Sequence, residues 1–176
     1  LARDDVTVAP ATVSRGGTTI AYTHPADHLF AFDGITTISL VDLTFTVDDP
    51  NRSRLVAGSP ADSPDNSFVH AGLDQPSISG DGRYLAYRSD ATSSDAVAGW
   101  GSGPAPGGPA TRQVFVWEIA QPDPFLAVHL VSALADGTPA LQGASEPAIS
   151  RDGMQIAFTS PSTDLVPAVY PTCSTD

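Results

Sequence analysis

Lysine is absent from this chain of 176 residues, and arginine supplies all eight of its cationic side chains. Twenty acidic residues, of which only two are glutamate, give a formal net charge of −12. No cationic stripe is available to displace counterions from a nucleic-acid backbone, so we expect no nucleic-acid partner. A charged partner is expected to be basic.

Cysteine and long apolar runs are also scarce. The single Cys173 excludes an internal disulfide framework and a cysteine-rich zinc site. No apolar run approaches the roughly 18 residues of a membrane-spanning helix, so the sequence predicts no membrane span. Aromatic residues make up only 7% of the chain, yet the apolar fraction of 41% is sufficient for one hydrophobic core.

Turn-forming residues are plentiful, with 18 Asp, 16 Pro and 15 Gly. Aspartate side chains accept hydrogen bonds from nearby backbone N–H groups, and glycine adopts positive φ angles at low cost. This composition favours short strands joined by turns and disfavours long helices.

A nine-residue pattern occurs twice, as Ser79-Gly-Asp-Gly-Arg-Tyr-Leu-Ala-Tyr and Ser150-Arg-Asp-Gly-Met-Gln-Ile-Ala-Phe. A weaker copy begins at Ser14 and has Gly16-Gly17 where the others have Asp-Gly. Apolar residues alternate after each turn, which predicts a hairpin in every copy. An alanine recurs at positions 21, 86 and 157, where we expect a neighbouring element to pack closely.

Two further apolar blocks follow the first two copies in the same order. The first pair begins at Ile38 and Val114, and the second pair begins at Arg54 and His129. One repeat is therefore predicted to be a four-stranded antiparallel meander, which is the form of a propeller blade.

The segments Pro76-Ser-Ile-Ser-Gly-Asp-Gly-Arg-Tyr-Leu-Ala-Tyr and Gln113-Val-Phe-Val-Trp-Glu resemble the repeat of TolB-like, six-bladed-type β-propellers. The segment from Glu146 to Ser160 is similar to the long-blade version of secreted bacterial proteins. The resemblance extends from about Ala11 to the end of the chain. It implies an all-β fold of propeller blades and an extracellular, cell-surface or periplasmic location.

The expected boundaries give about two and a half blades. Blade 1 is expected over 11–75, blade 2 over 76–146 with a loop insertion at 91–111, and the first half of blade 3 over 147–176. The N-terminal segment 1–10 offers a candidate strand of a preceding blade. A ring needs about four blades, and an open array leaves strand edges unpaired. We therefore expect further blades of the same protein, or other chains, to complete a larger propeller.

Catalytic motifs are not found. The segment Gly143-Ala-Ser145-Glu-Pro147 comes nearest to a nucleophile elbow, but it lacks the final glycine that the strained turn requires. The Ser-x-Asp-Gly pattern also departs from the Asp box of sialidases, because glycine directly follows the aspartate. The sequence predicts no catalytic and no cofactor-binding residues.

Metal and partner candidates are few. His24 and His28 are four residues apart, which on a helix would place two ligands on one face, but Pro25 lies between them. Asp48 and Asp49 offer oxygen ligands for calcium without the spacing of a dedicated calcium loop. In both cases the alternative is solvated turn residues, and calcium is the only cofactor candidate.

Trp100 lies in the Gly/Pro-rich insertion and is a candidate contact for a protein or glycan partner. The alternative is that its ring folds onto its own blade.

Three functions are compatible with these features. The first is a non-enzymatic extracellular binding or structural module that mediates protein–protein or surface interactions. The second is the substrate-filtering propeller of a larger prolyl-oligopeptidase-like hydrolase whose catalytic domain lies elsewhere. The third is a subunit of an extracellular filament or surface assembly with blade edges paired between chains.

Overall fold

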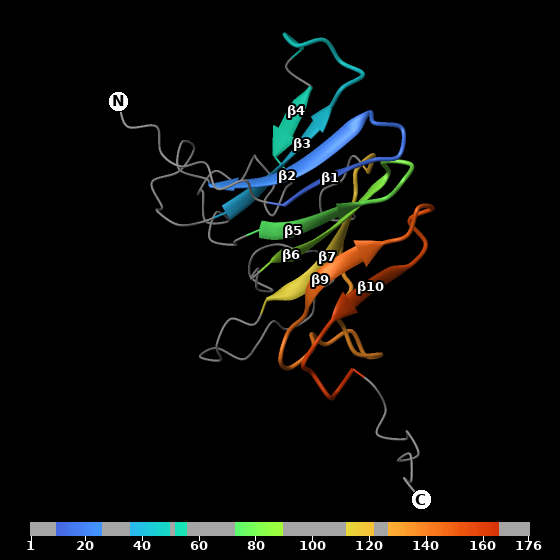
Figure 1. The fold of residues 1–176 in the computed structure, drawn as a ribbon. Coiled ribbons are helices and arrows are strands. Elements are labelled where there is room, and N and C mark those ends of the chain that lie inside the picture. The colour runs from blue at the N-terminus through green and yellow to red at the C-terminus, as the bar shows by residue number, and fades with distance from the viewer. Residues whose placement is uncertain are drawn as a thin grey trace, which may run out of the picture.

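The computed structural model describes residues 10–25, 36–49, 52–55, 73–89, 112–121 and 127–165 (Figure 1). In this part of the chain ten strands form three antiparallel sheets. The first sheet has the strand order β1 (Ala11–Val13), β2 (Thr19–Pro25), β3 (Thr36–Asp42) and β4 (Ser53–Leu55). The second has the order β5 (Leu73–Ile78), β6 (Tyr84–Ser89), β7 (Gln113–Glu118) and β8 (Val128–Leu130). The third pairs β9 (Ser145–Ile149) with β10 (Ile156–Thr159).

In both four-stranded sheets the spatial order of the strands follows the sequence order. This is the meander predicted from the repeat, and the all-β fold of partial propeller blades is confirmed. Among the described residues no helix is long and apolar enough to cross a membrane.

The second hairpin is organised by Ser79, which is fully buried. Its N–H donates to the carbonyl of Tyr84 at 2.9 Å, and its Oγ accepts from the Tyr84 N–H at 3.0 Å. The same hydroxyl donates to Oδ1 of Asp81 at 2.6 Å. Gly82, with φ of 74°, closes the turn by donating its N–H to the carbonyl of Ser79. One serine hydroxyl thus joins both sides of the turn.

The other two copies repeat this geometry. Ser150 Oγ donates to Asp152 Oδ1 at 2.6 Å and accepts from the Gln155 N–H at 2.9 Å. In the first copy the Ser14 Oγ accepts from the Thr19 N–H at 3.1 Å, without a carboxylate in the turn. The recurring serine therefore shapes the hairpins.

A bulge that the sequence analysis did not predict lies four residues before two of these serines. Gln75 and Glu146 have φ angles of 52° and 53°, and the β5–β6 and β9–β10 ladders are irregular there. Both residues precede a proline, Pro76 or Pro147, which cannot donate to the ladder. The Glu146 N–H donates to Oε1 of Gln75 at 2.8 Å and so links the two bulges.

Both strands continue on the N-terminal side of their bulges. β5 begins at Leu73 and β9 at Ser145, whereas the sequence placed the starts of the second and third blades at 76 and 147. The apolar alternation that marks the repeat becomes regular only after each proline.

The innermost strands β1, β5 and β9 follow one another across the molecule (Figure 1). The Ile78 N–H donates to Thr12 Oγ1 at 3.4 Å, and the Ile149 N–H donates to Ser77 Oγ at 3.2 Å. In the first two copies, the hydroxyl two residues before the hairpin serine thus bonds to the backbone of the next blade.

The core fills the space between the first and second blades and continues within the second. Ala21 and Ala86 are both fully buried, so a small residue is required there, as the repeat predicted. Ala157, the third copy, is exposed, because no blade covers that face among the described residues. The members of the core cluster are Ala21, Ile38, Leu40, Leu73, Ile78, Leu85, Tyr87, Phe115, Trp117, Ile119, Ala127 and Val128.

Candidate functional site

The three hairpin turns at 14–19, 79–84 and 150–155 lie side by side, and we call this set of turns the turn end (Figure 1). The Arg15 N–H donates to the carbonyl of Gly80 at 3.1 Å, which links the first turn to the second. A Cβ on Gly80 would come within 2.6 Å of Arg151 Cγ, so the third turn packs directly on the second.

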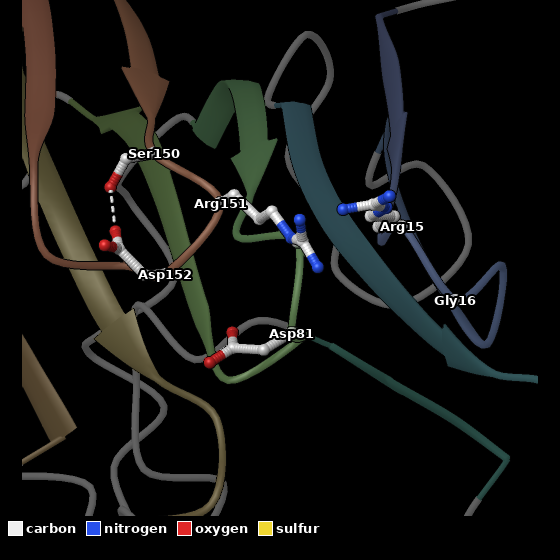
Figure 2. Close-up of a pocket in the computed structure, with 7 residues that line it drawn as sticks. Arg15, Gly16, Asp81, Ser150, Arg151 and Asp152 are labelled. Carbon is white, nitrogen blue, oxygen red and sulfur yellow. Dashed lines mark hydrogen bonds between the residues drawn. The ribbon is translucent and has the colours of Figure 1, made fainter.

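An open depression of about 930 Å³ lies across these turns. Its lining comes from all three blades, so it exists only because the blades stack in order. The lining residues are Arg15, Gly16, Gly80, Asp81, Ser150, Arg151 and Asp152 (Figure 2).

Arg15 and Arg151 both contact Gly80, and Figure 2 shows their guanidinium groups pointing toward one another. Both residues are exposed. Neither has an ion-pair partner within the described part of the chain. Two unpaired cations therefore converge on the depression of a strongly acidic protein.

The two carboxylates of the lining are engaged by their own turns. Asp81 Oδ1 accepts from Ser79 Oγ and from the Arg83 N–H at 3.1 Å. Asp152 Oδ1 accepts from its own serine hydroxyl and from the Met154 N–H at 3.1 Å. The serine hydrogen bond is the main cause that lowers the pKa of each carboxyl, so both remain charged.

Two other arginines, Arg88 and Arg112, form ion pairs outside the depression. Arg88 makes a bidentate contact with Asp74, through Nε to Oδ1 at 2.7 Å and Nη2 to Oδ2 at 2.6 Å. Arg112 Nη1 also donates to Asp74 Oδ2, at 2.5 Å. These three side chains are partly buried and form a closed ion-pair group, in contrast to Arg15 and Arg151.

Exposed apolar side chains lie beside the turns. The Leu43 N–H donates to the carbonyl of Thr18 at 2.7 Å, which holds the segment after β3 against the first turn. Leu43 on this segment is exposed, and so is Met154 in the third turn, at 79%. The turn end therefore combines apolar contact area with cationic groups.

Among the metal candidates that the structure describes, His24, Asp48 and Asp49 do not form a metal-binding group. His24 lies on β2, where Nε2 is hydrogen-bonded to Ser39 Oγ of β3 at 2.8 Å. Asp48 and Asp49 follow β3, and the Asp49 N–H donates to the carbonyl of Thr46 in a turn. Among the described residues no group of three or more His, Cys, Asp or Glu side chains is placed to hold a metal ion. The candidates His28 and Trp100 and the insertion 91–111 lie outside the described residues.

The sequence analysis missed Arg15 and Arg151. A signal was present, because each directly follows a hairpin serine, Ser14 or Ser150, and so occupies the same place in the repeat. The middle copy has Gly80 there, and the Arg151 side chain packs against it.

Neither a protein-family model nor a curated protein matches the sequence. Two solved structures that align with the chain are TolB from Acinetobacter baumannii and an acylaminoacyl peptidase in complex with Z-Gly-Gly-Phe-chloromethyl ketone. TolB has 14% identity and a TM-score of 0.45 over 90% of this chain and 27% of its own. The peptidase has 12% identity and a TM-score of 0.49 over 88% of this chain and 17% of its own. This chain thus spans less than a third of either protein. Likeness of this extent indicates no ligand or activity, and the description of the blades rests on the strand pairing of this chain.

Proposed function

We propose that this chain is a non-enzymatic binding module that uses the turn end to hold a protein partner outside the cytoplasm. Further blades, in the same protein or in other chains, would complete the ring around its innermost strands. The location follows the sequence resemblance to secreted propeller proteins.

One observation carries the proposal: exposed apolar and cationic side chains gather at the turn end on a rigid support. Each turn is closed by backbone and serine hydrogen bonds, and adjacent turns are in direct contact. Binding to such a support costs little backbone conformational entropy, because the backbone that carries the side chains is already ordered. Binding residues are commonly found on loops that a rigid scaffold positions.

The test is selection of binders from a random peptide library against the purified chain, followed by mapping with surface variants. Leu43→Asp and Met154→Asp place a charge on exposed apolar positions, one beside the first turn and one in the third. Both changes are expected to weaken the selected peptides by roughly tenfold or more, since a charge would have to be desolvated in the interface.

Leu141→Asp is the matched control. Leu141 is as exposed as Met154, at 76%, but precedes β9 and so lies at the opposite end of the blades. Peptides should bind this variant as they bind the parent chain. Binders that depend on Leu141 but not on Leu43 or Met154 would contradict the proposal, and so would the absence of any enriched peptide.

A further inference from the structure

We propose that the depression at the turn end binds an acidic peptide segment, with one carboxylate paired to Arg15 and a second to Arg151. This inference rests on the proposed binding function and names the chemistry of the partner. It differs from the expectation drawn from the net charge of −12, which favours a basic partner.

Local geometry supports an anionic ligand. Figure 2 shows two guanidinium groups that point toward each other across the second turn. Neither has an anionic partner among the described residues. Like charges that converge are stabilised when an anion lies between them, and guanidinium groups bind carboxylates through paired, charge-assisted hydrogen bonds.

The aspartates of the lining do not neutralise these cations. Asp81 and Asp152 each direct Oδ1 to the serine hydroxyl and a backbone N–H of their own turn. Carboxylates and guanidinium groups are therefore kept apart, although they line the same depression.

The shape favours a peptide over a single small anion. The two cations come from the first and third blades, and the depression of about 930 Å³ runs over the second. Arg151 packs against Gly80 of the second turn, and the exposed Met154 lies in the same turn as Arg151. An extended peptide with two acidic residues and one apolar residue would pair with Arg15 and Arg151 and contact Met154.

The experiment measures the affinity of a fluorescent eight-residue peptide that alternates Asp or Glu with Leu, by fluorescence polarisation. Its matched partner has Asn and Gln in place of the acids, and inorganic phosphate is titrated as a competitor. The acidic peptide is expected to bind at least about tenfold more tightly than the amide peptide, since each exposed pair contributes roughly threefold to tenfold.

Arg15→Gln and Arg151→Gln should each weaken binding of the acidic peptide by roughly threefold to tenfold. The double variant should bind both peptides alike. Arg83→Gln is the control, because Arg83 lies in the second turn with its guanidinium 5.5 Å from the Tyr84 ring centroid and does not line the depression. Unchanged unfolding midpoints would show that the variants remain folded.

Three results would overturn the inference: equal affinity for the acidic and amide peptides, an equal loss in Arg83→Gln, or phosphate binding as tight as the acidic peptide. The last result would identify a site for simple anions. If library peptides depend on the turn end but are not acidic, this inference fails while the proposed function stands.

Discussion

At the residue scale, the hairpin serine stabilises the turn through its hydroxyl. Ser79 and Ser150 make the same set of hydrogen bonds, but Ser79 is fully buried and Ser150 is only half-buried. The two copies therefore allow the loss of the same hydroxyl group to be compared at a buried and at a half-buried position.

Ser79→Ala is expected to lower the free energy of unfolding by roughly 1–3 kcal/mol, because the partly buried Tyr84 N–H loses its acceptor. Ser150→Ala should cost less, since water can replace the lost partner. Urea unfolding of the two variants measures the difference. Equal costs would mean that burial does not determine the strength of this contact.

The hydrogen bond from the serine should change the titration of the turn carboxyl group. The Ser79 hydroxyl is the main cause that lowers the pKa of Asp81 from 3.8. A lowered folded-state pKa stabilises the folded protein above pH 3.8, and this contribution is lost as the pH falls through the lowered value. In Ser79→Ala the pKa of Asp81 should rise toward 3.8, as followed by carboxyl carbon NMR. The Asp152 carboxyl, in a turn that keeps its serine, should titrate as before.

The sequence predicted the hairpins because a turn is encoded locally: a serine, an aspartate and a positive-φ glycine within four residues are sufficient. Arg15 and Arg151 were not predicted as a pair, although they occupy equivalent places. Their proximity depends on how adjacent blades stack, and no spacing along the chain specifies that distance.

At the element scale, a turn can require glycine for two reasons, and comparison of the repeat copies distinguishes them. Gly17 and Gly153 both have positive φ, at 68° and 74°. Nothing lies within 4 Å of a Cβ built on Gly17, whereas a Cβ on Gly153 would approach Tyr84 Cδ2 to 2.4 Å. Backbone conformation alone requires glycine in the first turn, and the neighbouring blade adds a second requirement in the third.

Gly17→Ala is expected to cost about 1–2 kcal/mol, the strain of a side chain at positive φ. Gly153→Ala should cost about 1–3 kcal/mol more, because the methyl group overlaps the Tyr84 ring. The excess should disappear when Tyr84→Ala is combined with Gly153→Ala, as measured by a double-mutant cycle of urea unfolding. If the extra destabilisation by Gly153→Ala persists in the Tyr84→Ala background, overlap with the Tyr84 ring is not its cause.

The bulges at Gln75 and Glu146 show what a repeat comparison misses within an element. Each residue lies four positions before its serine and directly before a proline, so the signal was periodic. The sequence did not predict the irregularity, because proline is also a common turn residue. Its missing N–H also interrupts a strand ladder.

At the scale of the whole molecule, stacking determines which equivalent positions are buried. The alanine seven residues after each hairpin serine is fully buried at 21 and 86 but exposed at 157. The sequence predicted the need for a small side chain at all three positions from their identity. It could not distinguish the third, because exposure there depends on whether another blade follows in space.

The difference in burial between Ala86 and Ala157 allows a test of whether a further blade packs on the third. Ala86→Val should destabilise the chain by about 1–3 kcal/mol, since two extra methyl groups enter a packed interface. Ala157→Val should change the stability of this chain by less than about 0.5 kcal/mol, because its side chain faces solvent. Differential scanning calorimetry of the two variants, alone and in a longer protein or assembly with further blades, measures both effects. If a further blade packs against β10, Ala157→Val should become as costly as Ala86→Val in that context. A valine that stays neutral at 157 in the completed assembly would show that the third blade ends the stack.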